Sequence, residues 1–203
     1  RTISSREAAR LQTFPDSHIF SGSSQRDISV QIGNAVPPVL AYLVAKQFGK
    51  PMPFVDLFCG GGGLSLGFLW AGWTPIIGSD WKAQFTESYA NNVHNKVVTG
   101  DIRDEDVQAK ILTEKGDQEV FLIGGPPCQG FSLANQRRKS ESGAKKRSEL
   151  FNYVDLINRL KPAAFLLENV GGMRDTQKNA ENAESTVSGL TQDEYVVAAK
   201  VLN

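Results

Sequence analysis

The sequence has few of the residues that would cross-link the chain or anchor it in a membrane. Cysteine occurs only at Cys59 and Cys128, too few for a disulfide framework or a zinc site, so we expect no bound metal. No run approaches the roughly 18 uninterrupted apolar residues of a membrane span. Residues 1–10 are polar and lack the apolar core of a signal peptide. We therefore expect a cytoplasmic protein in reducing surroundings, with no membrane partner.

An excess of one charge sign is also lacking. The chain has 22 lysines and arginines against 22 aspartates and glutamates, so net charge gives no indication of a nucleic-acid partner. Apolar residues make up 40 % of the 203, which is ordinary for a globular protein. The length predicts one domain over residues 1–203.

From residue 51 onward, apolar runs typical of buried strands alternate with segments of helical spacing. The expected strands are residues 54–58, 74–79, 97–99, 120–123, 163–167 and 194–202. The expected helices are a stretch that ends at residue 71, then residues 82–92, 104–112 and 150–160. This alternation predicts an α/β fold with a mostly parallel sheet over residues 51–203.

The first 50 residues do not follow this alternation. Ser4 and Glu7 have the spacing of a capping box, which opens a helix through Gln12. Residues 36–38 begin a second helix, for which we expect an apolar face made of Val39, Leu40, Leu43, Val44 and Phe48. The connection to the first strand is short, so both helices should pack on the sheet.

Four of the strands end in residues that could take part in chemistry, at the edge where ligands bind in such sheets. Four glycines, residues 60–63, come after the first strand, but Ser65 and Leu66 stand where a dinucleotide-binding fingerprint needs its third glycine. Asp80 could accept the hydroxyls of a ribose, Trp81 offers a flat face for adenine, and Asp101 could accept from an adenine amino group. A nucleoside pocket without a phosphate cradle favours S-adenosylmethionine over NAD.

Cys128 follows two prolines, Pro126 and Pro127, which fix the path of the chain. A nucleophile needs such fixed placement, although a buried structural cysteine is the alternative. Glu168 and Asn169 directly follow the fifth strand, which brings a carboxyl group beside the cysteine loop. A partner for a helix N-terminus is the other interpretation of that carboxyl group.

Five segments together resemble the DNA (cytosine-5)-methyltransferase family: "DLFCGGGGLSLGF", "GGPPCQGFS", "LLENV", "RTISSREAARLQTFPD" and "QIGNAVPP". In most members the last two lie at the C-terminal end, so the chain resembles a circularly permuted member. The resemblance implies a Rossmann-like fold that uses S-adenosylmethionine and acts on double-stranded DNA, as in restriction–modification systems. It places at the cofactor Phe58, Gly60, Gly62, Asp80, Trp81, Asp101, Ile102, Asn34 and Val36. It places at the reacting base Cys128, Glu168, Asn169, Pro127 and Gln129.

In the reaction that the resemblance implies, the Cys128 thiolate adds to C6 of a flipped cytosine while Glu168 holds a proton at N3. Ser132 and a cluster of basic residues that includes Arg137, Arg138 and Lys139 could grip the phosphates of DNA. The family's target-recognition domain and the arginine segment before it are not found in the sequence. We therefore expect a second chain or a C-terminal segment to supply them.

Other interpretations stay open at this point. A tRNA cytosine-5-methyltransferase would share the cysteine and the glutamate because the ring chemistry is the same. A non-catalytic subunit would bind the cofactor and form no adduct with DNA that contains 5-fluorocytosine. A nicotinamide-dependent dehydrogenase is weakened by the failed glycine fingerprint.

Overall fold

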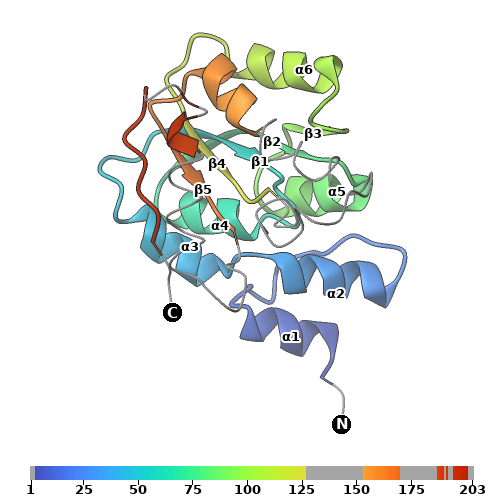
Figure 1. Cartoon of the computed structure of the whole chain (residues 1–203). Helices are drawn as coiled ribbons and strands as arrows, with labels where there is room; N and C mark the ends of the chain where they lie inside the picture. The colour runs from blue at the N-terminus through green and yellow to red at the C-terminus, as the bar shows by residue number, and fades with distance from the viewer. Residues whose placement is uncertain (1–2, 127–152, 170–186, 190, 192–193, 201–203) are drawn as a thin grey trace, which may run out of the picture.

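The computed structural model describes residues 3–126, 153–169, 187–189, 191 and 194–200. Its centre is a five-stranded sheet in the order β3-β2-β1-β4-β5, and every neighbouring pair of strands is parallel (Figure 1). The strands are β1 Pro53–Leu57, β2 Thr74–Asp80, β3 Val97–Thr99, β4 Phe121–Gly124 and β5 Ala164–Leu167. The helices are α1 Ser5–Leu11, α2 Gln25–Asn34, α3 Pro38–Ala45, α4 Gly63–Trp70, α5 Ala83–Asn92 and α6 Glu105–Lys115. Residues 153–160 form a further helical segment.

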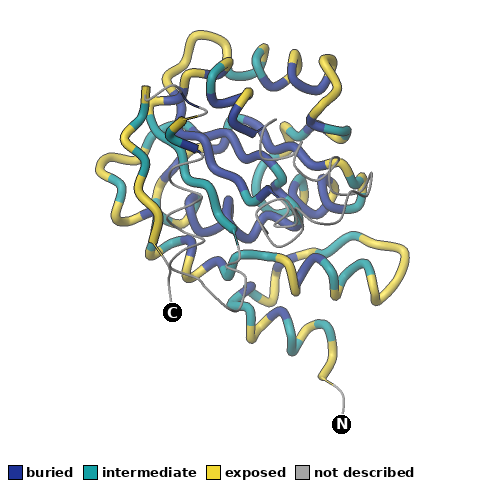
Figure 2. Tube along the Cα trace, in the orientation of Figure 1, coloured by how far each residue is buried: buried dark blue, intermediate teal, exposed yellow. Residues whose placement is uncertain are grey.

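The central strands are buried on both faces, which explains their near-continuous apolar sequences (Figure 2). Val55 of β1 and Leu122 of β4 face the cluster formed with α6 and residues 153–160. Phe54 and Phe121 face the opposite cluster, formed with α3 and α4. Helices therefore cover the two faces of the sheet, and the α/β architecture predicted from the sequence is confirmed.

The expected sixth strand is wrong where the structure describes it. Residues 194–200 form no strand. The Tyr195 hydroxyl donates to the Pro162 carbonyl at 2.8 Å, and its ring packs edge-on against Phe165 at 5.3 Å. The Tyr195 side chain therefore holds this segment against the start of β5, and no backbone hydrogen bonds of a β-ladder are found among its described residues. Residues 201–202 lie outside the described part.

The N-terminal region holds three helices rather than the expected two. Ser4 caps α1 and completes a capping box with Glu7, as predicted. The sequence analysis missed α2, which begins with a second capping box between Ser24 and Asp27. Each box satisfies backbone N–H groups that have no partner within the helix.

The apolar face expected for the second helix is wrong at three of its five residues, while Val44 is half-buried and Phe48, just beyond the helix, packs against Phe121. On α3 the buried residues are Pro38, Ala41 and Ala45, whereas Val39, Leu40 and Leu43 are exposed. The reason lies on α4. A Cβ at Gly67 would come within 2.4 Å of the Ala41 Cβ and 2.5 Å of the Pro38 carbonyl oxygen, so the two backbones touch through the smallest residues available.

Residues 19–21 run along α5 and tie the N-terminal region to the α/β part. Asn92 accepts from the Ile19 N–H at 2.8 Å and donates to the Ile19 carbonyl at 2.7 Å. The Ser88 hydroxyl accepts from the Ser21 N–H and donates to the Gln31 side chain at 2.6 Å. These polar contacts join residues that lie far apart in the sequence.

Residues 25–45 are long and apolar enough, by composition alone, to cross a membrane. Packed core helices meet the same test, so this is weak evidence. In the structure the stretch is divided at Ala35, whose backbone is extended (φ −77°, ψ 142°), into α2 and α3. Helix α3 packs against α4 of the α/β part, so α2 and α3 do not form one continuous membrane-spanning helix (Figure 1).

Candidate active site at the carboxyl edge of the sheet

The loop between β1 and α4 makes a sharp turn at the carboxyl edge of the sheet. Phe58 (φ 62°), Gly60 (φ 51°) and Gly62 (φ 87°) all adopt the left-handed conformation. At Gly62 a Cβ would also lie 2.8 Å from the Val93 side chain. The Cys59 N–H donates to the Ser79 carbonyl at 2.9 Å, which holds the turn against the end of β2. Space is open over Gly60, where a Cβ would meet no atom within 4 Å.

Asp80, at the end of β2, holds this loop through its carboxylate. Its Oδ2 accepts from the Gly60 N–H at 3.0 Å and its Oδ1 from the Lys82 N–H at 3.1 Å. Burial raises the pKa of Asp80, while these backbone hydrogen bonds oppose the rise. The Trp81 N–H also interacts with this carboxylate, and the four acceptor positions of a carboxylate leave room for a ligand hydroxyl beside these three N–H groups.

Trp81 follows with its side chain two-thirds exposed, at 67 %. The Lys82 ammonium lies 5.0 Å from the centre of the Trp81 ring. An open glycine loop, a carboxylate with free lone pairs and an exposed aromatic face fit the ribose and adenine of S-adenosylmethionine.

The remaining residues expected at the cofactor differ in their surroundings. Asp101 follows β3, and its carboxylate pairs with the guanidinium of Arg103. Ile102 is buried, and its carbonyl accepts from Gln108 at 2.8 Å. Val36 contacts the start of α4, because a Cβ at Gly63 would lie 2.4 Å from the Val36 carbonyl oxygen. Asn34 is exposed at the end of α2.

Glu168 and Asn169 follow β5 at the same edge of the sheet. The Glu168 N–H donates to the Gly124 carbonyl at 2.9 Å, which extends the pairing of β4 with β5. The carboxyl Oε2 lies 2.9 Å from the position of a Cβ at Gly125, so a larger residue there would displace it. Burial raises the pKa of Glu168, which favours a protonated carboxyl group.

The side chain of Asn169 is buried at both of its polar atoms, and neither has a hydrogen-bond partner within the described structure. Buried polar atoms without partners are rare in folded proteins. The structure thus places Glu168, with Asn169 next to it in the sequence, against Gly125, at the start of the segment that leads to Cys128. Pro127, Cys128, Gln129, Ser132, Arg137, Arg138 and Lys139 lie outside the described residues.

Sequence reasoning missed a polar cluster beneath the glycine loop. Asp56, on β1, accepts from the Ser65 hydroxyl at 2.5 Å, and Ser65 lies 3.3 Å from the Tyr89 hydroxyl. Burial raises the pKa of Asp56 to about 8 and that of Tyr89 well above its usual value. An aspartate inside an otherwise apolar strand was the available signal.

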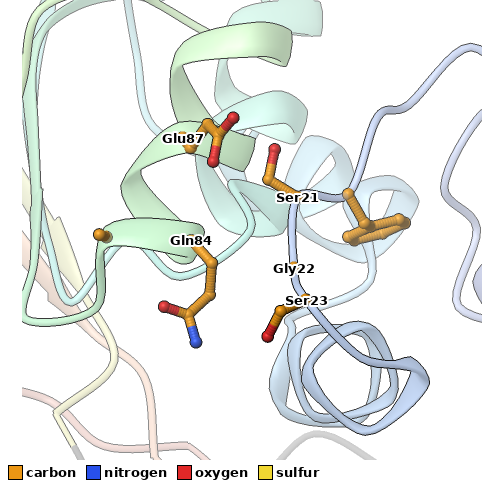
Figure 3. Close-up of a pocket in the computed structure, with 7 residues that line it drawn as sticks. Ser21, Gly22, Ser23, Gln84 and Glu87 are labelled. Atoms are coloured by element: carbon orange, nitrogen blue, oxygen red, sulfur yellow. The ribbon is translucent and has the colours of Figure 1, made fainter.

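A polar groove of about 530 Å³ lies between the loop after α1 and the start of α5. Figure 3 shows Gln84 and Glu87, on α5, opposite Ser21 and Ser23. The groove is lined by Phe20, Ser21, Gly22, Ser23, Ala83, Gln84 and Glu87. The groove adjoins α5, the helix that follows Asp80. It therefore lies on the Asp80 side of the site, whereas Glu168 follows β5, which is three strands away from β2 in the sheet.

A family model described as C-5 cytosine-specific DNA methylase matches residues 1–50 and 52–203. Type II methyltransferase M.FnuDI of Fusobacterium nucleatum is 34 % identical over 153 residues, which cover 75 % of this chain and 42 % of that protein. Type II methyltransferase M.AgeI of Thalassovita gelatinovora is 36 % identical over 126 residues, which cover 60 % of this chain and 28 % of that protein. The chain spans less than half the length of either relative.

A solved structure is also similar. The crystal structure of a putative DNA modification methyltransferase encoded within an E. coli prophage superposes with a TM-score of 0.53 at 26 % identity. The superposition covers 71 % of this chain and 38 % of that one.

Proposed function

The chain belongs to the family of C-5 cytosine-specific DNA methylases, and on this premise we propose that it is the catalytic part of a DNA cytosine-5-methyltransferase. S-adenosylmethionine is the methyl donor of the family. The proposed reaction adds this methyl group to C5 of cytosine in double-stranded DNA, in the cytoplasm and within a restriction–modification system. We also propose that residues 1–50 and 51–203 form one catalytic domain.

In this proposal the cofactor's nucleoside lies over the glycine loop, where the space over Gly60 is open. Asp80 accepts the ribose hydroxyls through the lone pairs that Gly60 and Lys82 leave free. Trp81 stacks on the adenine. Asp101 and Ile102 border the same nucleoside, and Asn34 and Val36 approach it from the N-terminal helices.

Cys128 is the proposed nucleophile. Its thiolate forms a bond to C6 of a cytosine that has left the base stack, and electron density moves into the ring. Glu168 holds a proton at N3 and so stabilises that density. After C5 has received the methyl group, a base removes the C5 proton, the bond between sulfur and C6 breaks, and the thiolate is restored.

The observation that carries this proposal is the placement of Glu168. Its carboxyl group lies against Gly125, three residues before Cys128, in a setting that raises its pKa. A general acid at neutral pH needs such a raised pKa. Asn169, whose buried amide has no partner among the described residues, is the group that we assign to orienting this carboxyl or the loop beside it.

A partner or an additional segment completes the enzyme in our proposal. Two observations support this idea. The chain matches less than half the length of each of the two relatives, and the outer face of α3 exposes the apolar residues Val39, Leu40 and Leu43. A helix that is apolar on all sides is usually buried. The added part would carry target recognition, while Ser132, Arg137, Arg138 and Lys139 would contact DNA phosphates. The 203-residue chain alone should then methylate DNA poorly.

Trapping on DNA that contains 5-fluorocytosine tests the proposal, because fluorine at C5 blocks the final elimination and leaves the enzyme attached. With the remaining polypeptide and S-adenosylmethionine present, we expect a covalent adduct that Cys128→Ser abolishes. Cys59→Ser is the matched control, since Cys59 is buried and burial raises its thiol pKa. Adducts that persist in Cys128→Ser, or that form on tRNA instead of DNA, would refute the proposal.

A further inference from the structure

His18 lies in the loop between α1 and α2 and is almost completely buried, at 1 % exposure. Its ring packs against the rings of Phe14 and Phe20, with ring centres 4.6 Å and 4.5 Å away, and these two phenylalanine rings also contact each other at 5.1 Å. The Nε2 atom is 3.0 Å from the Gly61 carbonyl oxygen. A carbonyl oxygen can only accept, so Nε2 carries the hydrogen. The other ring nitrogen, Nδ1, is buried without a partner in the described structure, and burial lowers the pKa of His18 to about 4. The ring is therefore a neutral donor fixed in one tautomer.

From this donor a continuous chain of hydrogen bonds leads to Asp80. The first link is the Gly61–Gly62 peptide. Its carbonyl, on Gly61, accepts from His18, and its N–H, on Gly62, donates to the Cys59 carbonyl at 2.9 Å. The Cys59–Gly60 peptide in turn donates through the Gly60 N–H to Oδ2 of Asp80, at 3.0 Å. Two peptide groups thus connect the imidazole to the carboxylate, and bonds in such a chain polarise one another.

The orientation of these two peptides is not fixed by the loop itself. Glycine accepts many backbone conformations, and Gly60 and Gly62 already lie in the left-handed region. If the Gly61–Gly62 peptide rotated, its carbonyl would leave His18 and its N–H would leave Cys59. The Gly60 N–H would then lose the support that aims it at Asp80.

We propose that His18 is a positioning residue for the cofactor, which fixes the two glycine peptides and, through them, the carboxylate of Asp80. This inference rests on the proposed function, because it assigns Asp80 to the ribose of S-adenosylmethionine. It makes the N-terminal region part of the cofactor site through a residue that would not touch the cofactor.

Two substitutions distinguish the contribution of the His18 N–H from that of its aromatic ring. His18→Phe keeps an aromatic ring packed against Phe14 and Phe20 but removes the N–H, whereas His18→Gln keeps an amide N–H at a similar reach. In the complete enzyme, His18→Phe should raise the KM for S-adenosylmethionine about tenfold, the effect of one lost buried hydrogen bond. The kcat at saturating cofactor should change less than threefold, and His18→Gln should recover most of the affinity. Equal affinity in all three proteins, or equal damage in both variants, would overturn the inference.

Two measurements without cofactor keep the inference separate from the proposed function. Amide hydrogen exchange at Gly62 should accelerate at least tenfold in His18→Phe, and unchanged exchange would refute the role of His18. In the wild type, ring ¹⁵N shifts should show the Nε2–H tautomer at pH 7 and at pH 5, and the other tautomer would also refute it. A wild-type chain that fails to bind S-adenosylmethionine would instead refute the cofactor assignment, and the exchange experiment would still decide on His18.

Discussion

Acidification from pH 7.5 to pH 5 should destabilise the folded chain through His18. The histidine has an ordinary pKa of 6.5, and burial lowers it to about 4 in the folded state. Between these pH values His18 is protonated in the unfolded chain and neutral in the folded chain, so the free energy of unfolding falls as the pH falls. The stabilisation is complete above pH 6.5 and is lost as the pH approaches 4. At pH 5 the loss amounts to about 2 kcal/mol relative to pH 7.5.

The surroundings of His18 give its protonated form no compensation. The elements around the ring contribute Phe14, Phe20 and the Gly61 carbonyl, and the nearby charge is Arg6, which disfavours a second cation. The guanidinium of Arg6 donates to the His18 carbonyl at 3.2 Å and so remains close. A proton on Nδ1 would have no acceptor within the described structure.

Urea unfolding at pH 5.0 and pH 7.5, with wild type and His18→Phe side by side, measures this contribution. Asp56, Asp80 and Glu168 have raised pKa values and act in the opposite direction, but both proteins contain them. Their effects cancel in the comparison, so the stability of the wild type relative to the variant should fall by about 2 kcal/mol from pH 7.5 to pH 5.0. A stability difference that stays the same at both pH values would show that His18 is protonated in the folded state without cost.

Four further perturbations give distinct results. Gly67→Ala should cost about 1–3 kcal/mol in urea unfolding, because its Cβ would collide with Ala41. Ser24→Ala removes the cap of α2 and should cost about 1 kcal/mol in the same assay. Asp80→Ala should weaken S-adenosylmethionine binding at least tenfold by calorimetry, and equal affinity would remove its ribose role. The wild type should lose on the order of 3 kcal/mol between pH 6 and pH 9 as Asp56 ionises, and Asp56→Asn should flatten that loss.

The sheet could be predicted from the sequence because its strands are short apolar runs between clear breaks. The bounds of the five observed strands agree with the prediction within one residue, and Gly72 ends the helix before β2 with a φ of 92°, as a glycine at that position should. Helix α2 was missed because its sequence, "QRDISVQIGN", has few apolar residues to reveal a period. Its capping box uses Asp27 in place of the more usual glutamate or glutamine.

Helix α3 shows a different limit. Its residues are apolar on every side, so periodicity could not tell which face is buried. The choice depends on Gly67, which lies on another helix and leaves room only for small partners. No local pattern in α3 contains that information.

The candidate site was predictable where topology determines it. Asp80 and Glu168 follow parallel strands, and the carboxyl ends of such strands meet at one edge of the sheet. The role of His18 was not predictable, because its partner is a backbone carbonyl 43 residues away and any residue could supply that atom. Cys128 and the basic cluster stay predictions from the sequence alone.

The contacts of residues 19–21 with α5 also set an order of events during synthesis. Helices α1 to α3 leave the ribosome before α4 and α5, yet Ile19 pairs with Asn92, 73 residues later, and Val36 and Ala41 pack on α4. Until α4 and α5 exist, α3 and residues 19–21 lack the partners described above, and long-range contacts form late because closing long loops costs entropy. We therefore expect the segment that contains α1 to α3 to be fixed only after α4 and α5 have been made. A nascent chain stopped before residue 92 should then expose its N-terminal region to a protease that the finished chain resists.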